Sequence, residues 1–271
     1  MNSMTIGFIG CGNLGESILS GILNIKFATP DRIFICNRTE ASNNNICKKY
    51  QVRYANAVDL IKTCDIILIG VKPNDVGGIL KVISKEVTKD KIIVSLAAGI
   101  KIEFIENRLP LFSKVIRAMP NVSSSVCCGS TCVVPNKVAT DNDTSLVVQL
   151  FNSVGKTIVL PESYIHSFIA LCGSSPAFVF MFIEALSDGA VRLGFPRQSS
   201  YEMACQTLMG AAKMLQESGK VPAQLKDKVC SPGGTTIEGL STLERGAFRS
   251  LVIEAMNDCA AKSKMMEDQN I

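Results

Sequence analysis

Short apolar runs alternate with amphipathic segments along the first half of the chain. Residues 5–9 form an apolar run, a glycine-rich turn follows, and apolar side chains then recur at helical spacing between Leu14 and Ile22. A second apolar run, 32–36, follows a Pro-Asp break. This order predicts a strand, a loop, a helix and a second strand, which together make a β-α-β unit.

Three further apolar runs with few charges cover residues 66–71, 92–96 and 114–119, and segments of helical length separate them. Strands that are apolar on both faces are typical of a parallel sheet covered by helices. The first half is therefore predicted to be an α/β domain.

The pattern changes after Pro161. Residues 162–271 hold long helical patterns that Gly and Pro clusters interrupt, and no segment of this half resembles a strand. We therefore predict two domains, 1–161 and 162–271, the second of them all-helical.

The helix predicted over residues 177–193 is apolar on most of its surface. Its polar side chains are Glu184, Ser187, Asp188 and Arg192, which fall on one narrow stripe. A small helical domain cannot easily cover so much apolar surface, so we expect a homo-oligomer in which a second subunit covers it. The alternative is a central helix buried within one subunit.

Charge and histidine content limit the possible functions. Lys and Arg number 28 and Asp and Glu 24, which is too small an excess for a nucleic-acid binder, so no nucleic-acid partner is expected. The single histidine, His166, cannot form a multi-histidine site, and we expect no bound metal. Any catalysis must run largely without imidazole.

The eleven cysteines include no C-x-x-C pair, and several lie inside apolar runs. An odd number in this arrangement favours reduced thiols and a reducing compartment over a disulfide framework. The cluster Cys127, Cys128 and Cys132 is compatible with metal binding or redox chemistry, but loop or core packing explains it more simply.

Neither a membrane span nor a targeting peptide is expected. No continuous apolar run approaches the roughly 18 residues of a spanning helix. The amino terminus lacks the basic flank and the cleavable apolar segment of a signal peptide. We therefore expect a cytoplasmic protein with no membrane partner.

Segment 10–15 reads G-C-G-N-L-G, which fits the G-x-G-x-x-G pattern between a predicted strand and a predicted helix. In that context the glycines allow a tight turn and the close approach of a pyrophosphate to helix N–H groups. A plain glycine turn is the alternative. The predicted cofactor-binding residues of this segment are Gly10, Cys11, Gly12, Asn13, Leu14 and Gly15.

The residues after the second strand bear on which nicotinamide cofactor is used. NAD-specific folds usually carry an acid there, for the ribose 2′-hydroxyl. Asn37 and Arg38 stand at that place instead, and a guanidinium suits a 2′-phosphate, although a lone loop arginine is often only solvated. We therefore expect NADPH as the cofactor, with NADH possible.

Ligands of open α/β sheets bind outside the carboxyl ends of the strands. Small residues at these ends allow a flat nicotinamide to approach the backbone. The further predicted cofactor contacts are Asn56, Val71, Lys72, Pro73 and Ala97.

Seven segments, in order along the chain, carry a family resemblance. They are GFIGCGNLGESI (7–18), VKP (71–73), SLAAG (95–99), RAMPN (117–121), CGSSPAF (172–178), QTLMGAAKML (206–215) and SPGGTTIEGL (231–240). Over essentially its whole length the chain resembles the pyrroline-5-carboxylate reductases.

The resemblance implies a Rossmann-type dinucleotide-binding domain followed by an all-helical dimerisation domain, with dimers assembled into a higher homo-oligomer such as a decamer. It also implies NAD(P)H-dependent reduction of 1-pyrroline-5-carboxylate to L-proline, the last step of proline biosynthesis. Two positions depart from the family pattern. Ser175 stands where a glycine able to adopt positive φ is usual, and Val122-Ser123 stands where Thr-Pro is common.

The implied substrate is a cyclic imine with a carboxylate, so its reduction needs a hydride, an anion site and a proton for nitrogen. Segment 231–236 opens a predicted helix, whose first N–H groups are suited to a carboxylate. The resemblance places the Thr236 hydroxyl by the ring nitrogen, as the catalytic residue, and Glu162 near the pocket. The spacing of Thr235 and Glu238 also fits a capping box, which needs no substrate. The predicted substrate-binding residues are Glu162, Ser231, Gly233, Gly234, Thr235 and Thr236.

Two other functions fit parts of this pattern. A β-hydroxyacid dehydrogenase shares the order of domains, but that family relies on a lysine in the helix after the boundary, and residues 162–191 contain none. A non-catalytic NADP(H) sensor would keep the glycine loop but would not need segment 231–236.

Overall fold

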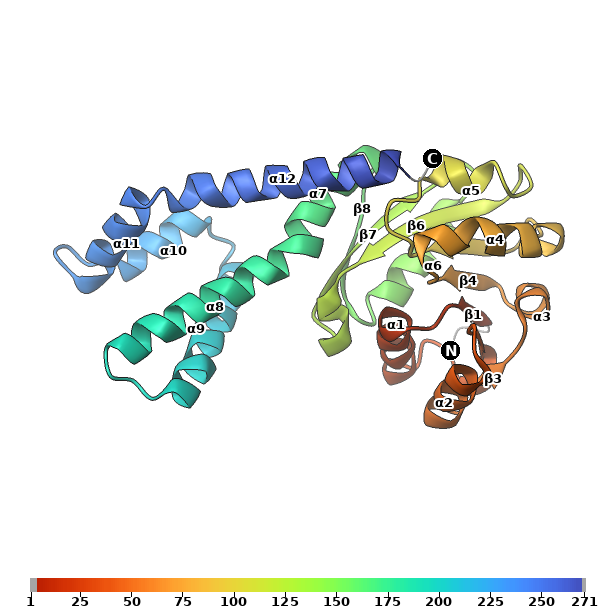
Figure 1. Cartoon of the computed structure of the whole chain (residues 1–271), viewed down its shortest axis with the longest axis horizontal. Coiled ribbons are helices and arrows are strands. Elements are labelled where there is room, and N and C mark those ends of the chain that lie inside the picture. The colour runs from red at the N-terminus through yellow and green to blue at the C-terminus, as the bar shows by residue number, and fades with distance from the viewer. Residues whose placement is uncertain (1–3, 270–271) are drawn as a thin grey trace. The chain divides into compact units, whose positions relative to one another are not determined.

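The computed structural model describes residues 4–269, and the chain divides into two compact units. The first, here called the sheet unit, comprises Met1–Gly173 and Cys259–Ile271, and the second, the helical unit, is Ser174–Asp258. The sheet unit holds every strand that the structure describes, whereas the helical unit contains only helices (Figure 1).

The sheet unit alternates strands and helices, as the apolar runs predicted. Its strands are β1 (Ile6–Ile9), β2 (Ile33–Cys36), β3 (Arg53–Tyr54), β4 (Ile66–Ile69), β5 (Ile92–Ser95), β6 (Lys114–Pro120), β7 (Gly129–Pro135) and β8 (Gly155–Val159). Its α-helices up to residue 173 are α1 (Asn13–Asn24), α2 (Glu40–Tyr50), α3 (Ala57–Thr63), α4 (Pro73–Ile83), α5 (Ile102–Glu106), α6 (Asp141–Phe151) and α7 (Ile165–Phe168). Short 3-10 helices cover Pro30–Arg32, Ser84–Glu86, Val122–Val126 and Glu162–Tyr164.

The strands form one sheet in the order β3-β2-β1-β4-β5-β6-β7-β8. All neighbouring pairs are parallel except β6 and β7. The first six strands follow the order of a doubly wound dinucleotide-binding fold, whose switch point lies between β1 and β4. The predicted α/β class is confirmed, and the carboxyl ends of β1, β2, β4 and β5 lie along one edge of the sheet.

The connection between β6 and β7 explains the antiparallel pair. A parallel crossover needs a dozen or more residues, whereas only residues 121–128 link these two strands. The apolar runs did not predict β3, β7 or β8. Both residues of β3 are exposed, and β8 is an edge strand that is largely exposed, so these two strands lack the two buried faces that a continuous apolar run indicates. Strand β7 is largely buried, but it begins with Gly, Ser and Thr, which shorten its apolar run.

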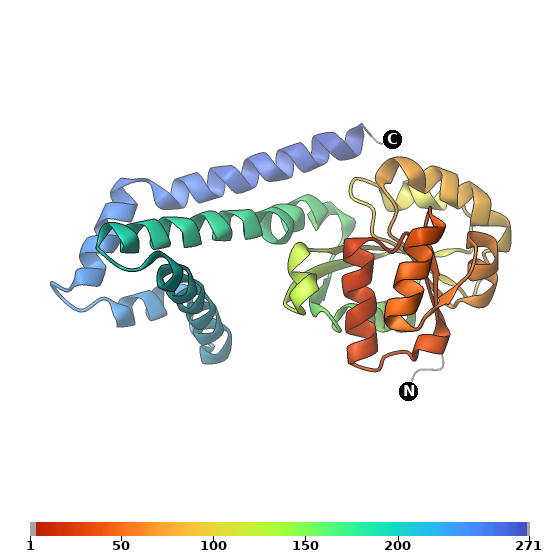
Figure 2. The same cartoon turned by 60° about the horizontal axis from the view of Figure 1, so that its bottom comes forward.

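Helices cover both faces of the sheet (Figures 1 and 2). On one face, side chains of α1, α2 and α6, such as Ile18, Ile46 and Phe151, form one buried cluster. On the other, side chains of α3, α4 and α5, such as Leu60 and Leu80, form a second. Two apolar layers of this kind fix the sheet and so hold the strand ends in place.

A π-helical turn, Ile169–Ser174, precedes α8 (Ser175–Arg192). Pro176 has no N–H for a carbonyl of the preceding turn, and the Asn121 side chain supplies a donor there, to the Cys172 carbonyl at 2.8 Å. Asn121 also accepts a hydrogen bond from the Ser130 N–H at 3.0 Å. Ser175 begins α8 and is not among the residues with positive φ, so its side chain causes no strain where a glycine was expected.

The helical unit consists of α8, α9 (Arg197–Ser218), α10 (Pro222–Val229), α11 (Thr235–Arg245) and the first part of α12 (Phe248–Asp268). Of its residues, all of which the structure describes, only Ser187, Ser200 and Ala204 are buried. A unit with so little core cannot be stable by burial within one chain alone.

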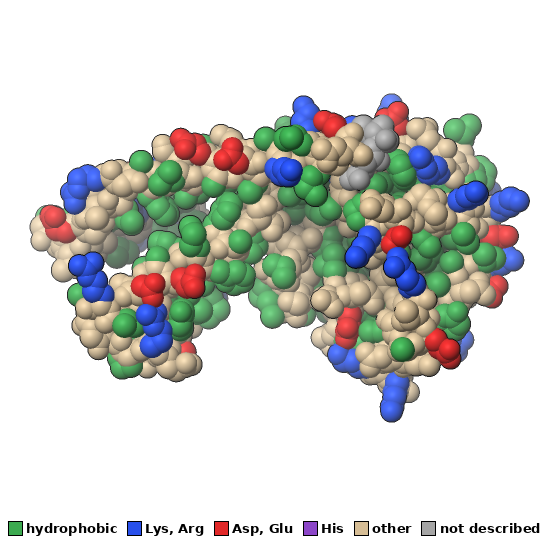
Figure 3. Space-filling model, viewed as in Figure 1, with side chains coloured by type: hydrophobic (Ala, Val, Ile, Leu, Met, Phe, Trp, Pro, Cys, Tyr) green, Lys and Arg blue, Asp and Glu red, His purple; other side chains and the backbone are tan. Residues whose placement is uncertain are grey.

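The polar stripe of α8 faces α9 in part. Ser187 is fully buried and hydrogen-bonds the Ser200 hydroxyl at 2.5 Å, while Asp188 pairs with Arg197 at 2.6 Å. Part of the apolar surface of α8 is covered, since Phe182 packs against Phe248, but much of it stays exposed. Figure 3 shows hydrophobic side chains gathered over these helices, and Phe180 and Met181 are 63% and 68% exposed.

One expectation about membranes needs correction. Among the described residues, the helical segment Glu162–Arg192 is long and apolar enough to cross a membrane by length and composition. The helix continues through α7, the π-helical turn and α8. It therefore joins apolar runs that are separate in the sequence into one long helical segment. A helix covered by another subunit has the same composition, so this finding assigns no membrane.

Candidate functional site

The loop between β1 and α1 has the geometry that each glycine of the G-x-G-x-x-G pattern requires. Gly10 adopts a φ of +86°, and a Cβ there would lie 2.8 Å from the Gly70 backbone. A Cβ on Gly12 would meet nothing within 4 Å, so the space in front of α1 is open. A Cβ on Gly15 would lie 3.3 Å from the Gly10 carbonyl oxygen, which shows close packing of helix and strand.

Helix α1 begins without a side-chain cap. Its N-cap is Gly12, no side chain accepts a hydrogen bond from its first turn, and the first N–H groups face the open space. Its only first-turn acid, Glu16, is held by Lys49 at 2.7 Å and by the Tyr50 hydroxyl at 3.0 Å. The residues present therefore fit a pyrophosphate at this helix start.

The Asn37 side chain supports the glycine loop. Its Oδ1 accepts a hydrogen bond from the Cys11 N–H at 2.6 Å, and the Gly10 N–H donates to the Cys36 carbonyl at 2.9 Å. Asn37 is in turn fixed by Asn43, whose Oδ1 accepts from the Asn37 N–H at 2.7 Å. Asn43 is 6% exposed, and no sequence pattern had singled it out.

Arg38 follows β2 and is largely exposed. Its Nη2 lies 2.6 Å from Asp75 Oδ2, and the two side chains are 78% and 40% exposed. The guanidinium is thus at the strand end where a 2′-phosphate was predicted to bind, and it already holds one carboxylate. Nothing in the sequence pattern had indicated Asp75.

The other predicted cofactor residues also follow strands of the sheet. Val71, Lys72 and Pro73 follow β4, with exposed Lys72 as the N-cap of α4 and Pro73 as its first residue. Ala97 follows β5, is 3% exposed, and donates its N–H to the Ser95 hydroxyl at 3.4 Å. Asn56 follows β3 and caps α3 by accepting a hydrogen bond from the Asp59 N–H at 3.0 Å.

Asn13 and Leu14, two further residues of the predicted set, lie in the first turn of α1. Asn13 accepts a hydrogen bond from the Ser17 hydroxyl on its carbonyl, at 2.9 Å, and Leu14 packs against the core. Burial and then the nearby Glu16 charge raise the pKa of the Cys11 thiol to about 12. Cys11 is therefore a neutral thiol at physiological pH and not a nucleophile.

Segment 231–236 connects α10 to α11 in the helical unit. Gly233 has a φ of +67°, and the Gly234 N–H donates to the Ser231 carbonyl at 3.0 Å, which closes a tight turn. A Cβ on Gly234 would meet the Ser231 Oγ, so a side chain there would displace the Ser231 hydroxyl. Ser231 and Thr235 are exposed, and Thr236 is half-buried.

The capping-box interpretation of Thr235 and Glu238 is wrong. The N-cap of α11 is Gly234, no side chain caps the helix, and Thr235 is the first helical residue. Because Thr235 already has helical geometry, its hydroxyl is not in the N-cap position that accepts from the first turn. Helix α11 therefore begins, like α1, at a glycine with uncapped N–H groups.

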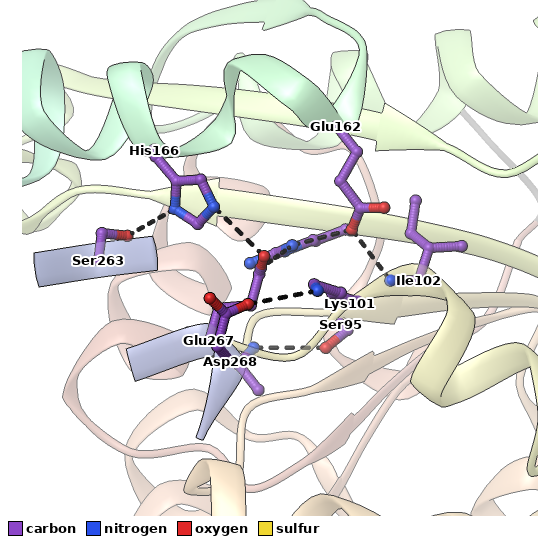
Figure 4. A network of polar contacts seen from close by, with 10 residues as sticks. Ser95, Lys101, Ile102, Glu162, His166, Ser263, Glu267 and Asp268 are labelled. Atoms are coloured by element: carbon purple, nitrogen blue, oxygen red, sulfur yellow. Dashed lines mark hydrogen bonds and ion pairs between the residues drawn. The ribbon is translucent and has the colours of Figure 1, made fainter. Parts of the chain in front are cut away.

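Glu162 belongs to a polar network in the sheet unit (Figure 4). Its Oε1 accepts hydrogen bonds from the Ile102 N–H at 3.0 Å and from Arg117 Nη1 at 2.8 Å. The Arg117 side chain is fully buried and also binds Glu267 Oε1 at 2.8 Å. Its Nε and Nη2 have no partner among the described residues.

His166 extends this network. Its Nε2 lies 3.2 Å from Glu267 Oε2 and its Nδ1 lies 3.0 Å from the Ser263 hydroxyl. The imidazole thus links the Ser263 hydroxyl to the Glu267 carboxylate within one network. Glu162 also borders a surface hollow of about 560 Å³.

The cysteines are all free thiols in the structure, with Cys127 and Cys128 exposed and Cys132 buried. Among residues 4–269, no group of three or more His, Cys, Asp or Glu side chains is placed to hold a metal ion. The cluster of three cysteines therefore lies partly in a loop and partly in the core.

Comparison with known proteins gives the same picture along the whole chain. Residues 162–266 match the family model described as pyrroline-5-carboxylate reductase dimerisation, and residues 5–99 match that of NADP oxidoreductase, coenzyme F420-dependent. The pyrroline-5-carboxylate reductase of Escherichia coli is 42% identical over 262 residues, which cover 96% of this chain and 97% of that protein. The chain belongs to the pyrroline-5-carboxylate reductase family.

Solved structures of the family agree with this assignment. A pyrroline-5-carboxylate reductase from Coxiella burnetii superposes with a TM-score of 0.93 at 31% identity, covering 98% of this chain and 99% of that one. The Plasmodium falciparum pyrroline carboxylate reductase with NADP bound gives a TM-score of 0.87 at 31% identity, with coverage of 98% and 99%. The fold and the two-part organisation of the family therefore extend to this chain.

Proposed function

We propose that this protein reduces 1-pyrroline-5-carboxylate to L-proline with NADPH, or with NADH, as the last step of proline biosynthesis. The observation that carries the proposal is the pair of helices, α1 and α11, that each begin at a glycine with uncapped N–H groups. One such helix start suits the pyrophosphate of a dinucleotide, and the other suits a substrate carboxylate. Full-length similarity to the family supports the same reaction.

The glycine loop and its neighbours bind the cofactor in this proposal. Gly10, Gly12 and Gly15 shape the pyrophosphate site, and Arg38 binds the 2′-phosphate. Asn13, Leu14, Asn56 and the residues after β4 and β5 complete the predicted set. When bound, the nicotinamide supplies the hydride for the imine carbon.

The loop before α11 holds the substrate. The N–H groups that follow Gly234, in the first turn of α11, bind the carboxylate, because the helix dipole and the uncapped donors favour an anion there. Ser231 and Thr235 are exposed beside them and add hydroxyl donors. Glu162 is also a proposed substrate-binding residue, and it would bind the substrate while it stays paired with Arg117.

Thr236 is the proposed catalytic residue. A threonine hydroxyl is a poor acid, so its role is to orient the imine nitrogen and to relay a proton to it from water; an iminium that already carries this proton needs only the orientation. Positioning of this kind accounts for a large share of enzymatic rate enhancement. No base of the usual imidazole type is required.

The proposed assembly is a dimer built through the helical domain, 162–271, with dimers joined into a higher homo-oligomer such as a decamer; residues 1–161 form the cofactor domain. The exposed apolar surface of α8 supports this assembly, since an oligomer would cover it. We further propose that the protein is cytoplasmic and that neither a membrane nor a nucleic acid is a partner.

The reaction is tested by following NADPH oxidation with and without 1-pyrroline-5-carboxylate. Oxidation that depends on this substrate supports the proposal, whereas a protein that binds NADPH without turnover would be a sensor. Turnover of β-hydroxyacids in place of the imine would identify a dehydrogenase.

The role of Thr236 is tested by substitution. Thr236→Ala should lower kcat/KM for the imine by on the order of 10- to 1,000-fold and leave NADPH affinity unchanged, while Thr236→Ser should keep much of the activity. Thr242→Ala is the matched control, because the Thr242 hydroxyl bonds groups of its own helix: it donates to the Glu238 carbonyl and accepts from the Arg245 side chain. Normal turnover by Thr236→Ala, or an equal loss in the control, would rule out the proposed role.

A further inference from the structure

The ion pair between Arg38 and Asp75 joins the two loops that flank the glycine loop. Arg38 follows β2 and Asp75 lies in the first turn of α4, after β4. Strands β2 and β4 both pair with β1, one on each side, and the glycine loop follows β1. The pair therefore lies at the carboxyl edge of the sheet, where a dinucleotide binds.

The Asp75 carboxylate occupies part of the Arg38 guanidinium, which the proposed cofactor site needs for the 2′-phosphate. Arg38 Nη2 lies 2.6 Å from Asp75 Oδ2, and a 2′-phosphate binds best when two N–H groups of one guanidinium face it. A phosphate that takes up this group must displace the carboxylate or share the guanidinium with it. In both cases a negative charge remains close to the phosphate, which weakens binding.

The exposure of the two side chains makes this competition reversible. At 78% and 40% exposure the ion pair is well solvated, and such pairs contribute little net stability. Binding of the phosphate can therefore break the ion pair, and the free energy of binding is reduced by the modest attraction between Arg38 and Asp75. NADH has no 2′-phosphate and does not compete for Arg38.

We propose that Asp75 is a specificity-determining residue for the nicotinamide cofactor, which lowers the preference for NADPH over NADH by competing with the 2′-phosphate for Arg38. This inference rests on the proposed 2′-phosphate site at Arg38. Asp75 would then limit how strongly the protein prefers NADPH, which the Asn37-Arg38 sequence alone does not reveal. Asp75 acts through Arg38 and does not contact the reacting atoms.

The test uses binding of adenosine 2′,5′-bisphosphate and of 5′-AMP to the full-length protein, measured by calorimetry. Asp75→Asn keeps the shape of the side chain and removes its charge. It should tighten binding of the bisphosphate by about 2- to 10-fold and leave 5′-AMP unchanged, as expected for one weak exposed ion pair plus the nearby charge. The ratio of kcat/KM for NADPH to that for NADH should rise by the same factor.

Two control variants make the result specific. Asp90→Asn removes an exposed acid just before β5, at the amino end of the strand and so at the opposite edge of the sheet, and should change neither affinity. In an Arg38→Ala background, Asp75→Asn should no longer tighten the bisphosphate, because the competition acts through the guanidinium.

Each other result contradicts the proposal. Weaker bisphosphate binding by Asp75→Asn would show that Asp75 orients Arg38, and unchanged binding would show that Asp75 has no role. If Asp75→Asn tightened the bisphosphate equally in the Arg38→Ala background, Asp75 would repel the phosphate directly and not through Arg38. If the parent protein binds the bisphosphate no better than 5′-AMP, the 2′-phosphate site itself fails and the role of Asp75 fails with it. Only that last result also counts against the proposed NADPH site.

Discussion

Replacing Arg117 by Met should destabilise the protein strongly, because the guanidinium is the centre of a buried charge network. The Arg117 side chain is 0% exposed and binds Glu162 and Glu267, each at 2.8 Å. Methionine fills the space of the side-chain stem but leaves the carboxylates without their cation. The Glu162 side chain is 32% exposed and can be hydrated, whereas that of Glu267 is 6% exposed and cannot.

The expected loss follows from that buried carboxylate. Removing one partner of a buried ion pair costs about 3–5 kcal/mol in the free energy of unfolding, which lowers Tm by roughly 6–20 °C for a unit of this size. A second substitution, Glu267→Gln, should recover part of the loss, since it removes the unpaired charge. The exposed pair of Lys49 and Glu16 offers a control, and Lys49→Met should shift Tm far less.

The assay is thermal and urea unfolding at one fixed protomer concentration, because unfolding of an oligomer depends on concentration. The proposed role of Arg117 would be refuted if Arg117→Met unfolded within about two degrees of the parent, a shift below 1 kcal/mol. It would equally be refuted if Glu267→Gln deepened the loss in the Arg117→Met background.

Two further predictions concern assembly and thiol chemistry. Phe180→Glu should shift the protein to smaller species in sedimentation, since it places a charge on the exposed apolar face of α8, while Leu111→Glu, at an exposed site of the sheet unit, should not; an unchanged oligomer would count against an interface on α8. Iodoacetamide at pH 8 should modify exposed Cys127 and leave Cys11 intact, because burial raises the pKa of the Cys11 thiol to about 12. Rapid alkylation of Cys11 in the folded protein would contradict its burial in the glycine loop.

The sequence was sufficient to predict the elements that are buried on both faces. Runs such as 66–71 and 92–96 became central parallel strands, and the glycine loop follows β1 as expected. Strand β7 was not predicted because its first residues are Gly, Ser and Thr, and β8 was not predicted because it is a largely exposed edge strand without a continuous apolar run. The capping box failed because residue spacing does not fix which residue becomes the N-cap.

The contacts around the candidate site were less predictable than its residues. Arg117 and Glu267 are 150 positions apart in the chain, and they meet because the end of α12 from Cys259 onward folds as part of the sheet unit. Asp75 and Asn43 are likewise ordinary polar residues in the sequence, whose partners Arg38 and Asn37 are fixed by tertiary structure. Local patterns report burial and turns, and they carry no signal for side-chain pairs of this kind.

The proposed reaction is tested most directly by tracing the hydride itself. The protein is supplied with 1-pyrroline-5-carboxylate and NADPH deuterated at the transferred position of nicotinamide C4, and the product is examined by mass spectrometry and NMR. We predict L-proline that carries one deuterium at carbon 5, the former imine carbon, in a one-to-one ratio to the NADPH oxidised. Absence of proline, or proline without the label, would contradict the proposed reaction.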